Sequence, residues 1–249
     1  TNLDSVTFEN NITAIGSYAF YGCSQLTNLI ITEGTTTIGS YAFANCTNLT
    51  TVYLPNSIET LEAGATGRTV FQNCSSLQFN EDDNGVLYLG NSNNPYVLLY
   101  DDGDFNGSTF IVPDGCKIIG AEAFYQNRYL VEITISASVT QLGAESLVGI
   151  GLSSIFHTVN FEEGSNLKRI EFGAFITCCD IDTLTIPASV NFIGKAVFMS
   201  CYIQTIYFEN PNGWTNSRGE TVDSIFANPT EAADYLIEQG AGSSTFSRS

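Results

Sequence analysis

The apolar positions of this chain recur with a period of 23 residues. Apolar runs end in dipeptides such as Ile15-Gly16, Ile38-Gly39 and Ile119-Gly120, and a small residue and an aromatic follow each of them. A cysteine comes next in most repeats, and then a segment with apolar residues at offsets 0, 3 and 5. The last two of these are two residues apart in a β-rich setting, which predicts a short strand with one buried face.

A single 23-residue unit cannot bury its own apolar face, so the repeat predicts a solenoid of stacked units. We expect the strands to form a parallel β-sheet on the concave side. The stretch from the glycine to the cysteine is too short for a long helix, so one or two turns of α or 3₁₀ are expected on the convex side. The aromatic and cysteine positions should fill the interior as ladders.

The repeats occupy residues 1–210, with one interruption at about 78–110. Two strand-like runs there, Val86–Leu89 and Tyr96–Tyr100, are joined by a polar turn and predict a β-hairpin that projects from the solenoid. Residues 211–240 are expected to form a C-terminal cap, with Thr230 as the N-cap of a helix. Residues 241–249 are expected to be a flexible tail.

The repeat pattern I-G-x-x-A-F-x-x-C-x-x-L-x-x-[IVL]-x-[IL]-P resembles the BspA-like bacterial leucine-rich repeat over roughly residues 1–210. The resemblance implies a horseshoe-like solenoid in a secreted or surface-displayed bacterial protein, with a signal sequence removed. Several family members are associated with adhesion or host contact. The expected function is therefore a non-enzymatic adhesion or binding scaffold. The alternative is an accessory binding segment of a larger secreted hydrolase whose catalytic domain lies outside this sequence.

The charge balance narrows the choice of partners. The chain has 8 basic and 26 acidic residues, a formal net charge of −18. Such a surface repels phosphate backbones and anionic lipids, so nucleic acid is not an expected partner. No apolar run approaches the roughly 18 residues needed to span a bilayer, so no membrane insertion is expected. The expected partner is therefore a protein or glycan on a host or bacterial surface.

The chemistry-bearing residues favour structural roles. Of seven cysteines, all but Cys179 fall at inward positions of the repeat, where a thiol acts as a small apolar group; a disulfide or redox role is the alternative. The single histidine, His157, lies in an inserted loop without a matching nucleophile. The pair Glu162-Glu163 is interpreted as solvated surface charge. The alternative is a glycosidase site, which needs two carboxylates across a cleft. No catalytic residue and no cofactor is expected.

One stretch weakly resembles a calcium loop. Asp102, Asp104 and Asn106 match the first half of D-x-D-x-N-G, but the twelfth position is Pro113 instead of a bidentate glutamate. A solvated acidic turn is the preferred interpretation, so no metal site is expected.

The outward positions of the strands are the candidate binding residues. They would lie on the concave face, which offers solenoids a broad binding surface. Threonine also suits any pleated surface, so a simple spacer is the alternative. The candidates are Ile30, Thr51, Tyr53, Ile111, Thr134, Thr185 and Tyr207.

The chain begins inside a repeat. Leu3, Val6 and Phe8 occupy the offsets of Leu26, Leu29 and Ile31, and no capping turn precedes them. An uncapped repeat exposes both core and strand edge, which predicts further sequence upstream and self-association through residues 1–10.

Overall fold

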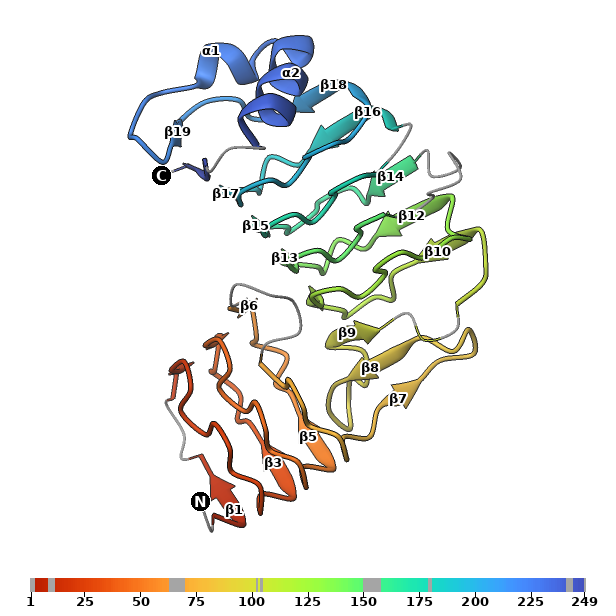
Figure 1. Cartoon of the computed structure of the whole chain (residues 1–249), viewed down its shortest axis with the longest axis vertical. Helices are drawn as coiled ribbons and strands as arrows, with labels where there is room; N and C mark the ends of the chain where they lie inside the picture. The colour runs from red at the N-terminus through yellow and green to blue at the C-terminus, as the bar shows by residue number, and fades with distance from the viewer. Residues whose placement is uncertain are drawn as a thin grey trace.

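The computed structural model describes residues 3–8, 12–62, 70–101, 103, 105–149, 158–178, 181–240 and 244–248. The chain winds as a β-solenoid of stacked repeats, as the 23-residue period predicts (Figure 1). Most repeats contribute one longer strand and one two-residue strand. The longer strands are β1 (Ser5–Thr7), β3 (Asn28–Ile30), β5 (Thr51–Tyr53), β10 (Thr109–Ile111), β12 (Glu132–Ile135), β14 (Thr158–Phe161), β16 (Ile181–Ile186) and β18 (Ile203–Phe208). The short strands are β2 (Ala14–Ile15), β4 (Thr37–Ile38), β6 (Thr60–Leu61), β11 (Ile118–Ile119), β13 (Gln141–Leu142), β15 (Arg169–Ile170) and β17 (Phe192–Ile193).

Parallel pairing sets equivalent residues of successive repeats side by side. In the first sheet Leu29 lies opposite Val6 on one side and Val52 on the other. Inside the core the aromatic position forms a ladder, with ring centroids 5.2 Å apart for Phe20 and Phe43 and 5.8 Å apart for Phe43 and Phe71. The predicted inward ladder is thereby confirmed.

In most repeats, the segment from the glycine position to the cysteine position consists of consecutive single turns. Hydrogen bonds of the 3₁₀ type close them, as from Cys23 N to Phe20 O at 3.2 Å, and the intervening amides bond to the next repeat, as from Phe20 N to Ala42 O at 2.8 Å. Two positions per repeat adopt a positive φ, for example 58° at Tyr41 and 60° at Asn45. A residue with left-handed backbone conformation ends each turn. The expected short turns are therefore present, but they do not continue into a helix.

The interruption at residues 78–110 does not project from the solenoid as expected. β8 (Leu87–Leu89) and β9 (Leu98–Asp101) form the predicted antiparallel pair, and β7 (Asn80–Glu81) adds a third strand. β9 also pairs in parallel with β11, which joins the hairpin to a nine-stranded sheet. The run Val97-Leu98-Leu99 is buried, as in strands covered on both faces.

Strands β8, β9 and β11, here called the dividing sheet, separate two hydrophobic cores. Tyr88 and Leu99 pack into the core of the later repeats, whereas Leu89 and Leu98 pack into that of the first repeats. Each strand therefore sends alternate side chains into opposite cores. β1 to β6 are called the N-terminal stack and β10 to β18 the C-terminal stack; Figure 1 shows them meeting at an angle.

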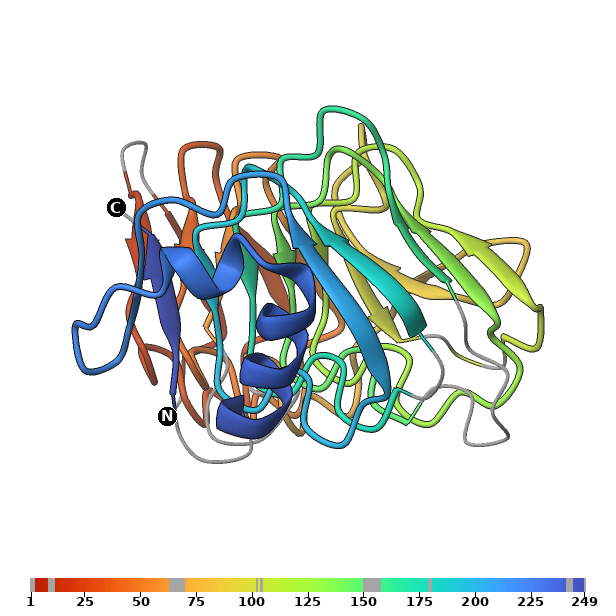
Figure 2. The ribbon, with the colours of Figure 1, turned by 90° about the horizontal axis from the view of Figure 1, so that it is seen from above.

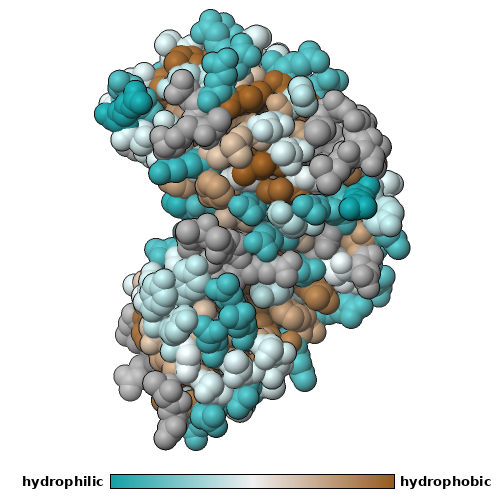
Figure 3. Space-filling view, in the orientation of Figure 1, coloured by the Kyte–Doolittle hydropathy of each residue, from teal (hydrophilic) through white to brown (hydrophobic). Residues whose placement is uncertain are grey.

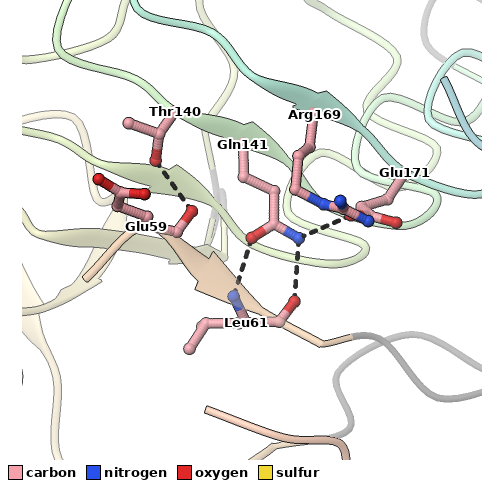
Figure 4. Close-up of polar contacts among 6 residues, drawn as sticks. All are labelled: Glu59, Leu61, Thr140, Gln141, Arg169 and Glu171. Atoms are coloured by element: carbon pink, nitrogen blue, oxygen red, sulfur yellow. Dashed lines mark hydrogen bonds and ion pairs between the residues drawn. The ribbon is translucent and has the colours of Figure 1, made fainter. Parts of the chain in front are cut away.

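A buried glutamine closes the inside of this angle (Figure 4). The Gln141 side-chain oxygen accepts from Leu61 N at 2.8 Å, and its amide nitrogen donates to Leu61 O at 2.9 Å. The Thr140 hydroxyl donates to Glu59 O at 3.0 Å. The amide of Gln141 thus pairs with the outer edge of β6 as a neighbouring strand would.

The C-terminal end of the solenoid is covered by β19 (Trp214–Asn216), α1 (Asp223–Phe226) and α2 (Pro229–Gly240). Figure 2 shows α2 lying beside β18. The N-cap of α2 is Asn228 rather than the predicted Thr230: its Oδ1 accepts from Thr230 N and Glu231 N, and its amide donates to Glu231 Oε1. Proline at the first helical position explains the shift, because its missing N–H needs no partner there.

The expected flexible tail is also corrected. β20 (Phe246–Arg248) pairs antiparallel with β17 and β19, and Phe246 is buried. Among the residues with a described placement, no helix is long and apolar enough to cross a membrane.

Candidate ligand-binding grooves

The seven predicted binding residues all lie on longer strands and alternate with buried core residues. Several are strongly exposed for their size: Ile30 is 58% exposed and Ile111 is 63% exposed. The parallel register places them in neighbouring pairs. Ile30 lies opposite Tyr53, Ile111 opposite Thr134, and Thr185 opposite Tyr207, while Thr51 lies two residues before Tyr53 on β5.

These pairs do not form one continuous face. They belong to three separate sheets, β1-β3-β5, β10-β12-β14 and β16-β18. They also lie outside the hollow of the molecule, which Figure 3 shows at the level where β6 approaches β13. Figure 1 places β10, β12 and β14 on the opposite side of the C-terminal stack from β13 and β15. The expectation of a single concave binding surface is therefore replaced by a broken outward face.

A groove lies at each of two places where the outward face is interrupted. The first, called the Tyr53 groove, lies between β5 and the hairpin and encloses about 490 Å³. It is lined by Thr50, Thr51, Val52, Tyr53, Gln78, Phe79, Asn80, Leu89, Gly90, Asn91, Ser92 and Pro95. The second, called the Glu162 groove, lies between β14 and β16 and encloses about 480 Å³. It is lined by Thr158, Val159, Asn160, Phe161, Glu162, Glu163, Gly164, Ser165, Thr183, Thr185, Pro187, Ala188, Ser189 and Glu209.

A glycine follows Tyr53 across the sheet and lines the Tyr53 groove. Gly90 is the parallel neighbour of Tyr53, and Leu54 N donates to Gly90 O at 3.0 Å. A Cβ on Gly90 would lie 2.2 Å from Asn94 O, so the returning loop requires glycine at this position. The outward ladder therefore has no side chain at this position, and the backbone of Asn94 and Pro95 occupies its place.

The walls of the Tyr53 groove are fixed by internal hydrogen bonds. The Asn91 amide donates to Leu54 O at 2.8 Å, and its Oδ1 accepts from the backbone of Asn93 and Asn94. The Asn80 amide donates to Pro95 O at 3.2 Å. Phe79 packs on Tyr100 with ring centroids 4.5 Å apart. These contacts hold the groove open before any ligand arrives.

The Glu162 groove is acidic, and two of its three carboxylates have structural partners. Glu162 accepts a hydrogen bond from Ala137 N at 3.0 Å, and Glu209 accepts one from Ala188 N at 2.8 Å. Glu33, one position later in its own repeat, accepts instead from Asn56 N and Ser57 N of the following repeat. Carboxylates just after the longer strands thus link successive turns of the solenoid, which favours the interpretation of Glu162 as structural rather than as half of a catalytic pair.

The remaining candidates fall into two groups. His157, Cys179, Asp102 and Asp104 lie outside the described residues; Asn106, the third calcium candidate, is exposed. The six other cysteines are buried, and burial raises the pKa of Cys116 to about 12. Within the described ranges no group of three or more His, Cys, Asp or Glu side chains is placed to hold a metal ion.

Sequence reasoning found Thr51 and Tyr53 but missed the opposite wall of their groove. Gln78, Phe79 and Gly90 belong to the interruption, which was expected to project away from the strands. The one available signal was the unbroken apolar run of β9, which indicates burial on both faces.

A family model described as the BspA type leucine rich repeat region matches residues 1–93 and 103–217, in six copies. No curated protein matches the chain. Solved structures that resemble it include a leucine rich cell surface protein from Faecalibacterium prausnitzii, with 23% identity and a TM-score of 0.38 over 79% of this chain. Another is the pneumococcal vaccine antigen PcpA, with 17% identity and a TM-score of 0.45 over 81% of this chain. The chain spans 63% and 61% of the lengths of these two structures.

Proposed function

We propose that this chain, which belongs to the BspA-type leucine-rich repeat family, is a binding scaffold that is secreted or displayed on a bacterial cell surface, where it attaches to a surface protein or glycan. The similarity to a bacterial cell surface protein supports this location. The proposal contains no catalytic step: adhesion needs only a shaped surface held rigidly by the repeats.

One observation carries the proposal: large apolar side chains stand at exposed positions of the outward face. Ile30, Tyr53, Ile111 and Tyr207 are between 41% and 63% exposed, although every one of them could be threonine without loss of the sheet. Contact surfaces are enriched in aromatic residues. Exposed apolar groups at the same repeat position on separate sheets therefore favour an interaction surface.

The proposal is tested by binding of the purified chain to immobilised extracellular-matrix proteins, mucins and defined oligosaccharides. In a face variant, Ile30, Ile111 and Tyr207 are all changed to serine. In the control, Tyr18, Tyr129 and Tyr202, which are 57% to 73% exposed and lie off the longer strands, are changed to serine. We expect the face variant to lose at least about tenfold in affinity, since buried anchors dominate interfaces. Equal loss in both variants, or no binding by the unmodified chain, contradicts the proposal.

A further inference from the structure

We propose that the Tyr53 groove is a binding site for a neutral sugar residue of a glycan. This inference rests on the proposed binding function and names the class of ligand for one of its two grooves. It is carried by three properties of the groove: its shape, its lack of charge and its unused hydrogen-bonding groups.

The shape provides an open groove next to an aromatic ring. Along the outward ladder Ile30 and Tyr53 are neighbours, and the next position is Gly90. The backbone of Asn94 and Pro95 lies against Gly90, so that strand places no side chain beside the tyrosine. The ring is 41% exposed and lines the groove of about 490 Å³, where it can contact a ligand. Sugar rings present C–H groups that suit the negative face of an aromatic ring.

The charge of the groove is unusual for this protein. The chain carries a formal net charge of −18, yet none of the groove-lining residues is acidic or basic. The groove therefore offers no partner to a cationic ligand, and the acidic surroundings disfavour anionic ones such as sialylated or sulfated glycans. A neutral, polar molecule fits this environment.

The hydrogen-bonding groups suit hydroxyl-rich ligands. The side chains of Thr51, Gln78 and Tyr53 make no hydrogen bond to any part of the chain that the structure describes, so their donors and acceptors are free for a ligand. An amide and two hydroxyls provide both donors and acceptors, as the hydroxyl groups of a sugar require. Asn80 and Asn91, by contrast, are held by backbone contacts and fix the walls. Few, convergent polar groups around an aromatic surface are typical of small-ligand sites.

The Glu162 groove differs from the Tyr53 groove in charge and in its lining residues. It has nearly the same volume and also contains hydroxyl side chains, Thr183 and Thr185 among them. It has three glutamates in its lining and no tyrosine. The two grooves can therefore be compared within one molecule.

The experiment measures binding of the full chain to immobilised neutral oligosaccharides ending in glucose, galactose, mannose or N-acetylhexosamine, alongside sialylated and sulfated counterparts. We expect at least one neutral glycan to bind and its charged counterpart to bind more weakly. Raising the salt from about 0.05 M to about 0.5 M should change the dissociation constant by less than about twofold, because no charge pair forms.

The variants are Tyr53→Ala, Tyr53→Phe and Gln78→Ala, with Tyr202→Ala as the control, because Tyr202 is exposed but lies off the longer strands and outside the groove. Tyr53→Ala and Gln78→Ala should weaken binding about tenfold, and Tyr53→Phe, which keeps the ring and loses only a hydroxyl, should weaken it less. Tyr202→Ala should stay within about threefold. Gln78 is exposed, so its replacement does not threaten the fold.

The inference is overturned if no neutral glycan binds, or if Tyr53→Ala and Tyr202→Ala weaken binding equally. If protein or glycan binding is lost in the face variant described above but kept in Tyr53→Ala and Gln78→Ala, only the groove assignment fails. If the face variant also keeps all binding, the proposed function fails with it.

Discussion

The cysteine position of the repeat combines a small apolar volume with one hydrogen-bond donor. The thiols of Cys46, Cys74 and Cys201 donate to the carbonyl of the ladder phenylalanine one repeat earlier, at 3.3, 3.2 and 2.7 Å. The carbonyls of Phe20 and Phe175 also accept a backbone N–H, from Cys23 and Cys178 respectively. Removing the Cys46 thiol therefore leaves the Phe20 carbonyl with a partner, whereas removing a ladder ring empties the core.

This difference predicts unequal costs for two neighbouring substitutions. Cys46→Ala should lower the free energy of unfolding by about 1 kcal/mol, and Phe43→Ala by about 3 to 5 kcal/mol, because a fully buried ring between two others leaves a large cavity. Urea denaturation of both variants measures the two values. Equal losses would show that Phe43 does not support the stack.

The buried thiol of Cys116 predicts a specific dependence of stability on pH. Burial raises its pKa from 9.0 to about 12 in the folded chain. The stabilising effect is full below pH 9 and is lost as the pH rises toward 12, because the unfolded chain releases the proton first. Between these values the native protein should lose up to about 1.4 kcal/mol per pH unit more than Cys116→Val. Parallel pH profiles of the two proteins would contradict this assignment.

At the scale of elements, strands whose register follows the repeat could be predicted, and elements outside it could not. The pairing of Leu29 with Val52 follows from the period alone. β9 breaks the period, and its position depends on contacts with β11 that lie far along the chain. The same holds for the binding face: periodicity identifies Tyr53 as outward-facing, but Gln78 reaches the same groove only through the fold of the interruption.

The cap of α2 provides a test at this scale. Asn228→Ala removes the acceptor for two helix N–H groups and the contact with Glu231, so it should destabilise the chain by about 1 kcal/mol. Thr230→Ala, at the position that sequence alone favours, should cost little because that residue already lies within the helix. Thermal unfolding of both variants measures the difference. The opposite ranking would restore Thr230 as the cap.

At the scale of the whole molecule, the two stacks are joined by more than chain connectivity. The dividing sheet belongs to both cores, and Gln141 adds a second connection across the bend. Glu171 accepts a hydrogen bond from the Gln141 amide at 3.3 Å and pairs with Arg169 at 2.6 Å, which fixes the orientation of the amide. The repeats therefore form a rigid frame for the two grooves.

Gln141→Ala should reveal the strength of this connection. It leaves both the N–H and the carbonyl of Leu61 without their partner, which should cost about 2 to 4 kcal/mol. Amide hydrogen exchange should also accelerate at β6. Gln204→Ala, which removes an exposed amide that donates to Asp182, is the control and should change stability by less than about 0.5 kcal/mol. Equal effects of the two substitutions would mean that β6 is held by other contacts.

The contact between Leu61 and Gln141 also constrains how such a protein can evolve. Repeat arrays commonly gain or lose units, because each unit contacts only its neighbours. Here two residues 80 positions apart close a loop, so inserting or deleting a unit between them would move Gln141 away from β6. Units outside this closed segment carry no such constraint. Duplication should therefore alter the number of repeats before β6 and after β13, while the segment between them, which carries the Gln78-to-Pro95 wall of the Tyr53 groove, keeps a fixed length.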